Sequence, residues 1–330
     1  MKIALTGDVM LGRLVDEAVI RNTALPPETV WGDVLPFLFT VDRRLCNLEC
    51  VISSKGTAWH PESKAFHFRA HPRAIDVLQA ARVDCVTLAN NHSLDYGVQA
   101  LAECLSFLDR AGIRHAGAGL NLEAALAPAL LTHATGSVAV IALTDNEPEW
   151  EARPAVPGIN YIDYDSRGLV EPYRSRMKGM IDHARRLAQF LIVSAHVGPN
   201  WGAPSQAMQA LAHDLLDFGA DLYWGHSNHT SQGVELYHGK IILYSTGDFI
   251  DDYAVDPHAR NDLSFLFVLD LDRMQVRTVR LYPVAIERFK IRLARGAEST
   301  LLEQRMQTMC AVFRTKIQFQ NGQGVITVIR

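Results

Sequence analysis

The chain alternates short apolar runs with amphipathic stretches as far as Gly233, and this alternation restricts the folds open to it. The apolar runs expected to form buried strands are residues 3–5, 44–46, 85–88, 138–143, 190–194 and 222–224. Helical patterns occupy residues 15–20, 72–81, 97–111, 172–189 and 205–218. Because strands and helices alternate along the chain, we expect a layered α/β fold.

The pattern changes after Gly233 to closely spaced strand-like runs with turn residues between them. These runs are residues 234–237, 241–244, 264–269 and 276–286, and a helix near residues 299–313 follows. An antiparallel section therefore follows the alternating part. Residues 145–170 hold three prolines and many charges, so we expect a loop there, a candidate lid over a site.

Composition shows no seam, so we predict one domain. It comprises residues 1–290, with residues 291–330 as a C-terminal helix and strand packed on it. No heptad or apolar patch indicates an oligomeric state.

Charge, hydropathy and cysteine content indicate which partners the protein can bind and in which compartment it is expected. The net charge is −4, and Lys and Arg are dispersed, so we expect neither nucleic acid nor an anionic membrane as a partner. The N-terminus has no apolar signal core, and no stretch reaches the length of a membrane span. Five cysteines, an odd number, favour buried thiols over disulfides. We therefore expect a cytoplasmic protein.

Five polar segments each follow an apolar strand-like run. In layered α/β folds, ligands collect at the carboxyl ends of strands, so these segments are the candidate site. They are GDVMLGR at 7–13, NLE at 47–49, LANNH at 88–92, SAHVGPNW at 194–201 and GHSNH at 225–229.

The donor types in these segments suit a metal ion. They supply two carboxylates, one carboxamide and three imidazoles, which are ligands that Zn²⁺, Mn²⁺ or Fe²⁺ accept. Two cations about 3.5–4 Å apart would generate hydroxide from water and clamp a hydrolytic transition state. The candidate ligands are Asp8, Glu49, Asn91, His196, His226 and His229.

Each ligand taken alone has a structural explanation. Asp8 could cap the following helix, Glu49 could pair with Arg43 or Arg44, and His196 could be an interior histidine. Asn91 could end a strand, since asparagine is a good turn former. Two histidines in one Gly-led loop, His226 and His229, are harder to explain in this way.

Two further groups of charged residues are candidates for binding a substrate. Asp248, Asp251, Asp252, Arg260 and Asp262 fall in a loop that the order of elements places near the strand ends, or they form a solvated loop. Arg13 could hold an anionic group by its planar fork, or could pair with Asp16 or Glu17.

Taken together, the five ordered segments resemble the CapA-like poly-γ-glutamate capsule proteins, which look like a branch of the calcineurin-like metallophosphoesterase superfamily. The resemblance covers residues 1 to about 286, and segments 64–72, 88–97 and 242–253 look like connecting motifs of that family. It implies a four-layer α-β-β-α sandwich with metals at the strand ends.

The resemblance also implies roles for single residues. Glu49 takes the position of the bridging carboxylate, Asn91, His196 and His226 complete one metal site, and Asp8 with His229 belongs to the other. His92 takes the place of the histidine that protonates the leaving group or steadies the transition-state charge.

Two departures from phosphoesterases are part of the CapA-like pattern. Met10 stands where phosphoesterases usually carry a histidine ligand, and Glu49 stands where they use aspartate. The first metal position is thus short of one ligand, so we expect one or two divalent ions.

Three functions are consistent with these residues. The leading hypothesis is a metal-dependent hydrolase of a phosphoester or a γ-glutamyl-type amide in poly-γ-glutamate metabolism, with His92 and Asp8 catalytic and Arg13, Asp248 and Asp252 binding substrate. The second is a peptide epimerase in which Asp8 and a histidine of segment 225–229 exchange protons with a substrate carbon next to a carbonyl group. The third is a non-catalytic accessory protein for polyglutamate synthesis.

Overall fold

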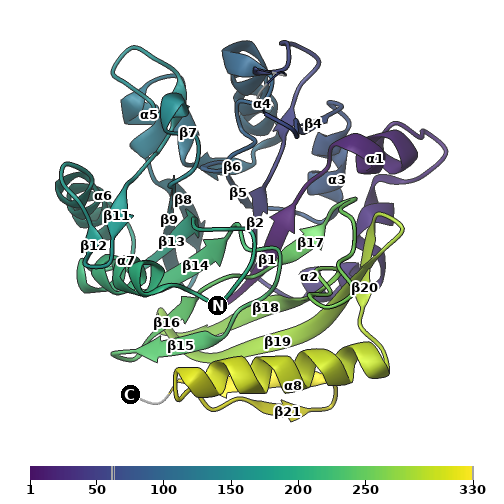
Figure 1. Cartoon of the computed structure of the whole chain (residues 1–330), viewed down its shortest axis with the longest axis vertical. Helices are drawn as coiled ribbons and strands as arrows, with labels where there is room; N and C mark the ends of the chain where they lie inside the picture. The colour runs from purple at the N-terminus through teal and green to yellow at the C-terminus, as the bar shows by residue number, and fades with distance from the viewer. Residues whose placement is uncertain (61, 63, 329–330) are drawn as a thin grey trace.

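Most of the strands lie in two large sheets (Figure 1). The computed structural model describes residues 1–60, 62 and 64–328. The ten-stranded sheet has the order β21-β22-β19-β18-β1-β2-β5-β6, with β17 on β1 and β20 on β19. Its strands are β1 (Lys2–Val9), β2 (Arg43–Leu48), β5 (Cys85–Thr87), β6 (Arg114–Ala116), β17 (Asp248–Ile250), β18 (Leu263–Asp272), β19 (Gln275–Glu287), β20 (Lys290–Leu293), β21 (Gln318–Gln320) and β22 (Gln323–Thr327).

The second sheet has six strands in the order β15-β16-β14-β13-β9-β8. They are β8 (Ala129–His133), β9 (Gly136–Thr144), β13 (Phe190–His196), β14 (Leu222–His226), β15 (Val234–Tyr237) and β16 (Lys240–Leu243). Its four central strands run parallel. They are buried on both faces, which explains why they read as continuous apolar runs in the sequence.

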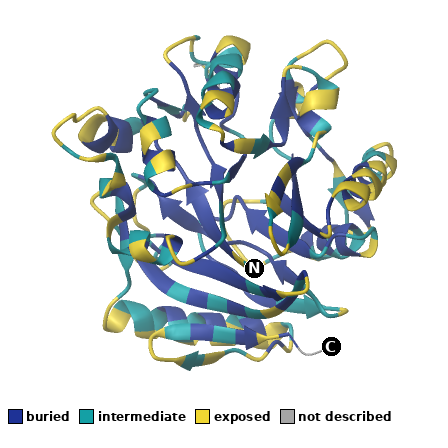
Figure 2. Ribbon diagram, turned by 180° about the vertical axis from the view of Figure 1, so that it is seen from behind, coloured by how far each residue is buried: buried dark blue, intermediate teal, exposed yellow. Residues whose placement is uncertain are grey.

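Three apolar clusters separate four layers. One cluster joins residues of both sheets, such as Leu5, Phe267 and Trp224, so the sheets pack face to face. The second lies between the larger sheet and the helices α1 (Arg13–Val15), α2 (Leu35–Leu38), α3 (Ala74–Ala80) and α4 (Gly97–Ala111). The third packs α6 (Tyr173–Leu187) and α7 (Gln206–Asp217) on the smaller sheet. The α-β-β-α sandwich is therefore confirmed, and Figure 2 shows its buried sheets between exposed helix faces.

The parallel strands of each sheet end level with one another. Asp8 of β1 lies in register with Asn47 of β2, and His196 of β13 lies in register with His226 of β14. Polar residues from both sheets are thereby brought to one edge of the sandwich.

Two glycines let backbone segments approach closely at this edge. A Cβ atom on Gly7 would lie 1.9 Å from the carbonyl oxygen of Gly247, and one on Gly225 would lie 2.1 Å from that of Tyr244. Each glycine directly precedes a candidate ligand, Asp8 or His226, so the close approach fixes where those side chains begin.

Most of the expected strands and helices are present with shifted ends, and α4 has the predicted bounds. The helix expected at 15–20 is α1 continued by a π-helical turn, Asp16–Ile20. The segment 145–170 is more ordered than the loop predicted there. It contains the 3₁₀ turn Pro148–Trp150 and the strands β10 (Gly158–Ile159), β11 (Tyr164–Asp165) and β12 (Gly168–Leu169), and β10 pairs with β7 (Ala118–Gly119).

The C-terminal part packs against the sandwich. Helix α8 (Ala297–Val312) contributes Leu302, Met306 and Cys310 to the cluster between the sheets, and it runs beside β19 in Figure 1. Strand β22 pairs with β19. All five cysteines are free and buried, as expected. Among the described helices, none combines the length and hydrophobicity that crossing a bilayer requires.

Candidate metal centre

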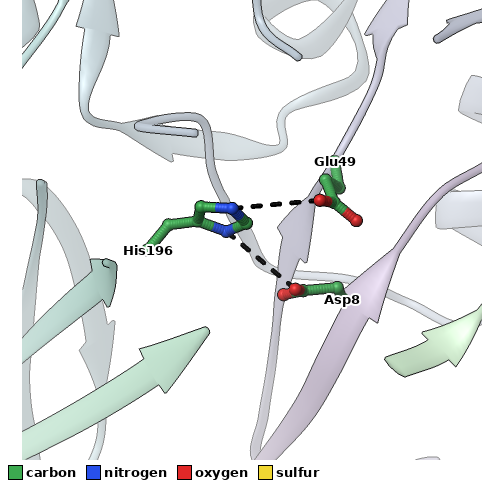
Figure 3. A group of neighbouring side chains, drawn as sticks. All are labelled: Asp8, Glu49 and His196. Carbon is green, nitrogen blue, oxygen red and sulfur yellow. Dashed lines mark ion pairs between the residues drawn. The ribbon is translucent and has the colours of Figure 1, made fainter. Parts of the chain in front are cut away.

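Three side chains from both sheets converge at the strand ends. Oδ2 of Asp8 lies 3.9 Å from Nδ1 of His196, and Oε1 of Glu49 lies 3.9 Å from its Nε2 (Figure 3). One ligand atom of each residue lies within 4.8 Å of the others, and all three residues are at most 2% exposed. Such spacing leaves room for a cation between them.

Asp8 is held by neighbours from several elements. His226 Nδ1 lies 2.7 Å from Oδ1, Asn47 Nδ2 donates to Oδ1 at 2.9 Å, and the Ser227 amide donates to Oδ2 at 3.3 Å. Burial raises the pKa of Asp8, but His226 and His196 outweigh it and lower the pKa to about 2. Asp8 is therefore an anion at neutral pH and a weak base. Gly12, not Asp8, caps α1.

His196 and Glu49 respond to burial in opposite ways. Burial lowers the pKa of His196 to about 3, so its ring is neutral and suited to ligation. Burial, together with the charge of Asp8, raises the pKa of Glu49 well above its ordinary value. Tyr253 donates a hydrogen bond to Glu49 Oε2 at 3.0 Å. Arg43 and Arg44 pair with Asp84, so neither neutralises Glu49.

Buried polar atoms of two candidate ligands lack a hydrogen-bond partner: Oδ1 of Asn91 and Nε2 of His226. An unsatisfied buried acceptor is costly unless something fills it, and both atoms are ordinary metal ligands. Asp8, Glu49 and His196 supply oxygen and nitrogen donors that fit a divalent cation, and Asn91 and His226 are candidates to complete the set.

His229 and Met10 lie differently from these residues. Nδ1 of His229 lies 2.9 Å from Oδ1 of Asp248, and its ring packs against Trp201 and Tyr253. A carboxylate that orients a histidine in this way is common beside metals. Met10 is fully buried in the core, and its sulfur accepts a hydrogen bond from the Gly12 amide. The position thus supplies no ligand.

His92 lies at one end of a series of polar contacts that runs through Asp95 and Lys64 to Glu147. Its Nδ1 lies 2.6 Å from Oδ2 of Asp95, and Lys64 Nζ lies 2.9 Å from Oδ1 of Asp95 and 2.8 Å from Glu147. Burial lowers the pKa of His92 despite the charge of Asp95. His92 Nε2 lies 3.1 Å from Nδ2 of Asn91, so this nitrogen lies beside a candidate ligand.

The cluster opens into a cavity of about 360 Å³. Its walls include Glu49, Asn91, His92, His196 and His229, together with Arg13, Lys64, Phe66, Phe68, Trp201 and Tyr253. No residue of the segment 145–170 is among those lining it. The expectation of a lid from that segment was wrong, because it packs on α7 and through Glu147 on Lys64.

The predicted substrate-binding residues occupy different positions. Arg13 lines the cavity, and its Nε lies 3.3 Å from Oδ2 of Asp252, so it pairs with neither Asp16 nor Glu17. Asp248 and Asp252 are absent from the lining and contact His229 and Arg13. Elsewhere in the charged loop, Arg260 forms two hydrogen bonds with Asp262.

Sequence reasoning missed four residues of this site: Asn47, Lys64, Asp95 and Tyr253. Asn47, Lys64 and Tyr253 contact residues that are distant in the chain, so the sequence does not predict these contacts. Asp95 is three residues after His92, and this spacing is a local signal of their contact.

The sequence model of the family described as "Bacterial capsule synthesis protein PGA_cap" matches residues 2–253. The chain belongs to this family. A sequence comparison agrees with this assignment. The chain is 32% identical to the "Probable polyglutamine synthesis accessory protein" of Mycobacterium tuberculosis, over 96% of this chain and 92% of that protein.

Two more distant similarities complete the comparison. The PGA biosynthesis protein CapA of Bacillus subtilis is 26% identical over 76% of this PGA_cap chain and 63% of its own length. A phosphatase of Mycoplasma pneumoniae with a solved structure aligns at a TM-score of 0.46 with 12% identity, over 88% of this chain and 90% of that one. Likeness at that level carries no information about chemistry.

Proposed function

We propose that the chain is a metal-dependent hydrolase whose site is the cavity above Asp8, Glu49 and His196. The observation that carries the proposal is the convergence of these three buried side chains from both sheets. We assign to the site one or two divalent ions, Mn²⁺, Zn²⁺ or Fe²⁺. The proposed ligands are Asp8, Glu49, Asn91, His196, His226 and His229.

The residues around the ligands have separable tasks. A divalent ion bound here would lower the pKa of a water molecule and withdraw electron density from the substrate. Tyr253 holds Glu49 through its hydroxyl, and Asp248 holds His229 through Nδ1. Asp95 holds His92 through Nδ1, and Nε2 of His92 lies beside Asn91, from where it would deliver a proton to the leaving group.

The substrate we propose is a phosphoester or a γ-glutamyl-type amide. The amide follows from the family, since the relatives are named for polyglutamine or PGA synthesis. Arg13 is the cavity's candidate for holding an anionic group, because it lines the cavity and a guanidinium that pairs with Asp252 through Nε has further N–H donors.

The two alternatives make different demands on the site. Epimerisation needs a basic residue next to the carbon acid, and the low pKa of Asp8 makes it a poor base. The mycobacterial relative is named an accessory protein, and such a role needs no catalytic site. The buried unpartnered atoms of Asn91 and His226 instead favour a bound ion.

The test is hydrolysis by protein reconstituted with Mn²⁺, using bis-p-nitrophenyl phosphate and γ-glutamyl-p-nitroanilide. We expect turnover of at least one substrate, lost on chelation and in Glu49→Gln, and retained in the control Glu123→Gln on the exposed surface of α5 (Leu122–Leu126). Solvent deuterium incorporated into a peptide without cleavage would instead support epimerisation. Metal-loaded protein inactive in every assay would support the accessory role.

A further inference from the structure

A second hollow lies beside the cavity of the metal centre. Its volume is about 560 Å³, and α8 forms one wall through residues such as Leu301, Gln304 and Thr308. Helix α8 lies outside residues 2–253, the part of the chain that matches the family model. The hollow is therefore built partly by a segment to which the family match assigns nothing.

The two hollows share walls. Trp201 lines both of them. The segment 200–202 contributes Asn200 to the first and Gly202 to the second, and the segment 227–232 contributes His229 to the first and Thr230 to the second. The hollows are thus neighbours on either side of Trp201, whose side chain is 46% exposed.

Seven of the fourteen described residues that line the second hollow are apolar, and most of the surface exposed to the hollow is apolar. Leu263, Phe265, Leu302 and Met309 are among them, and Arg305 is the one charged side chain among the described residues that line it. The guanidinium of Arg305 donates hydrogen bonds to the carbonyl oxygens of His258 and Ala259, so it already has partners within the protein. A surface of this kind favours a hydrocarbon group over repeated carboxylates.

The cations of the first cavity are also compensated. Arg13 faces Asp252, and Lys64 faces both Asp95 and Glu147. A chain of carboxylates extending from the metal centre would therefore find few free positive charges. The exposed ring of Phe66 and that of Trp201 instead supply apolar surface at the cavity wall.

We propose that the second hollow binds an apolar chain of the substrate while the substrate's anionic head lies in the first cavity. The substrate class is thus an amphiphile, in which a metal-binding head group is joined to a hydrocarbon portion that passes Trp201. This inference rests on the proposed function, because the head group needs the metal centre.

The experiment measures the binding of alkylphosphonates to the Mn²⁺-loaded full chain by calorimetry. Methyl-, hexyl- and decylphosphonate carry one head group and chains of increasing length. A fully buried methylene contributes up to about fourfold in affinity, so we expect at least a tenfold gain from methyl to hexyl. The variant Thr308→Trp fills the hollow from an exposed helix position.

The control Gln307→Trp adds the same side chain at the adjacent exposed position, which does not line the hollow. We expect Thr308→Trp to remove the gain with chain length and to leave methylphosphonate binding unchanged, and Gln307→Trp to change neither. Equal affinities for all three phosphonates would overturn this inference and leave the proposed hydrolase standing. Failure of every phosphonate to bind would contradict the proposed function and this inference with it.

Discussion

Replacing Gly7 by alanine perturbs the metal centre through the backbone alone. The added Cβ would lie 1.9 Å from the carbonyl oxygen of Gly247, which accepts the Asp8 amide at 2.8 Å. The strands have to separate by roughly an ångström before that contact becomes tolerable. Overpacking costs about 1–3 kcal/mol, and the lost hydrogen bond adds about 1 kcal/mol. We expect Gly7→Ala to lower the free energy of unfolding by about 2–4 kcal/mol.

The same displacement moves Asp8, and metal sites tolerate only about 0.2 Å of change in ligand distance. We therefore expect Mn²⁺ affinity to fall at least about tenfold. Urea denaturation of metal-free protein and a Mn²⁺ titration measure the two effects. The control is Gly179→Ala in α6, where nothing lies within 4 Å of the added Cβ and we expect a gain of about 0.5–1 kcal/mol. Unchanged stability and affinity in Gly7→Ala would show that the close approach of Gly7 and Gly247 does not position Asp8.

Three further predictions concern side chains of the site. If His92 donates a proton, kcat falls as pH rises through its pKa, which burial keeps below 6.5, and His92→Asn costs about 10²–10⁴-fold in rate. Asp95→Asn removes a charge that raises this pKa, so the limb of the pH–rate profile shifts to lower pH; an unmoved limb would exclude His92. Glu49 has a raised pKa, so metal-free protein loses stability as pH rises above about 4.5, where unfolded chains ionise. Glu49→Gln should remove that loss in thermal melts while abolishing metal binding, and a steeper loss would contradict this. Tyr253→Phe removes the hydrogen bond to Glu49 and should weaken metal affinity about 10–100-fold in a Mn²⁺ titration, whereas full affinity would show that Glu49 needs no such support.

The layered fold could be predicted because strands of the smaller sheet such as β13 and β14 are buried on both faces and are therefore apolar throughout. The convergence of Asp8 and His196 could also be predicted, because each residue lies at the carboxyl end of an apolar strand. The pairing of β10 with β7 could not be predicted, because each strand has two residues and depends on a partner far along the chain. The contact between Asp248 and His229, 19 residues apart in the chain, could not be predicted either.

The metal content per chain tests most directly whether Asp8, Glu49 and His196 hold a catalytic metal. The protein is purified without chelator or affinity metal and assayed by elemental analysis beside Asp8→Ala, His196→Ala and the exposed control His183→Ala on α6. We predict one or two divalent ions per chain in the unaltered protein and in the control, with a loss in both site variants. Full metal content in Asp8→Ala and His196→Ala would show that these side chains do not hold a metal.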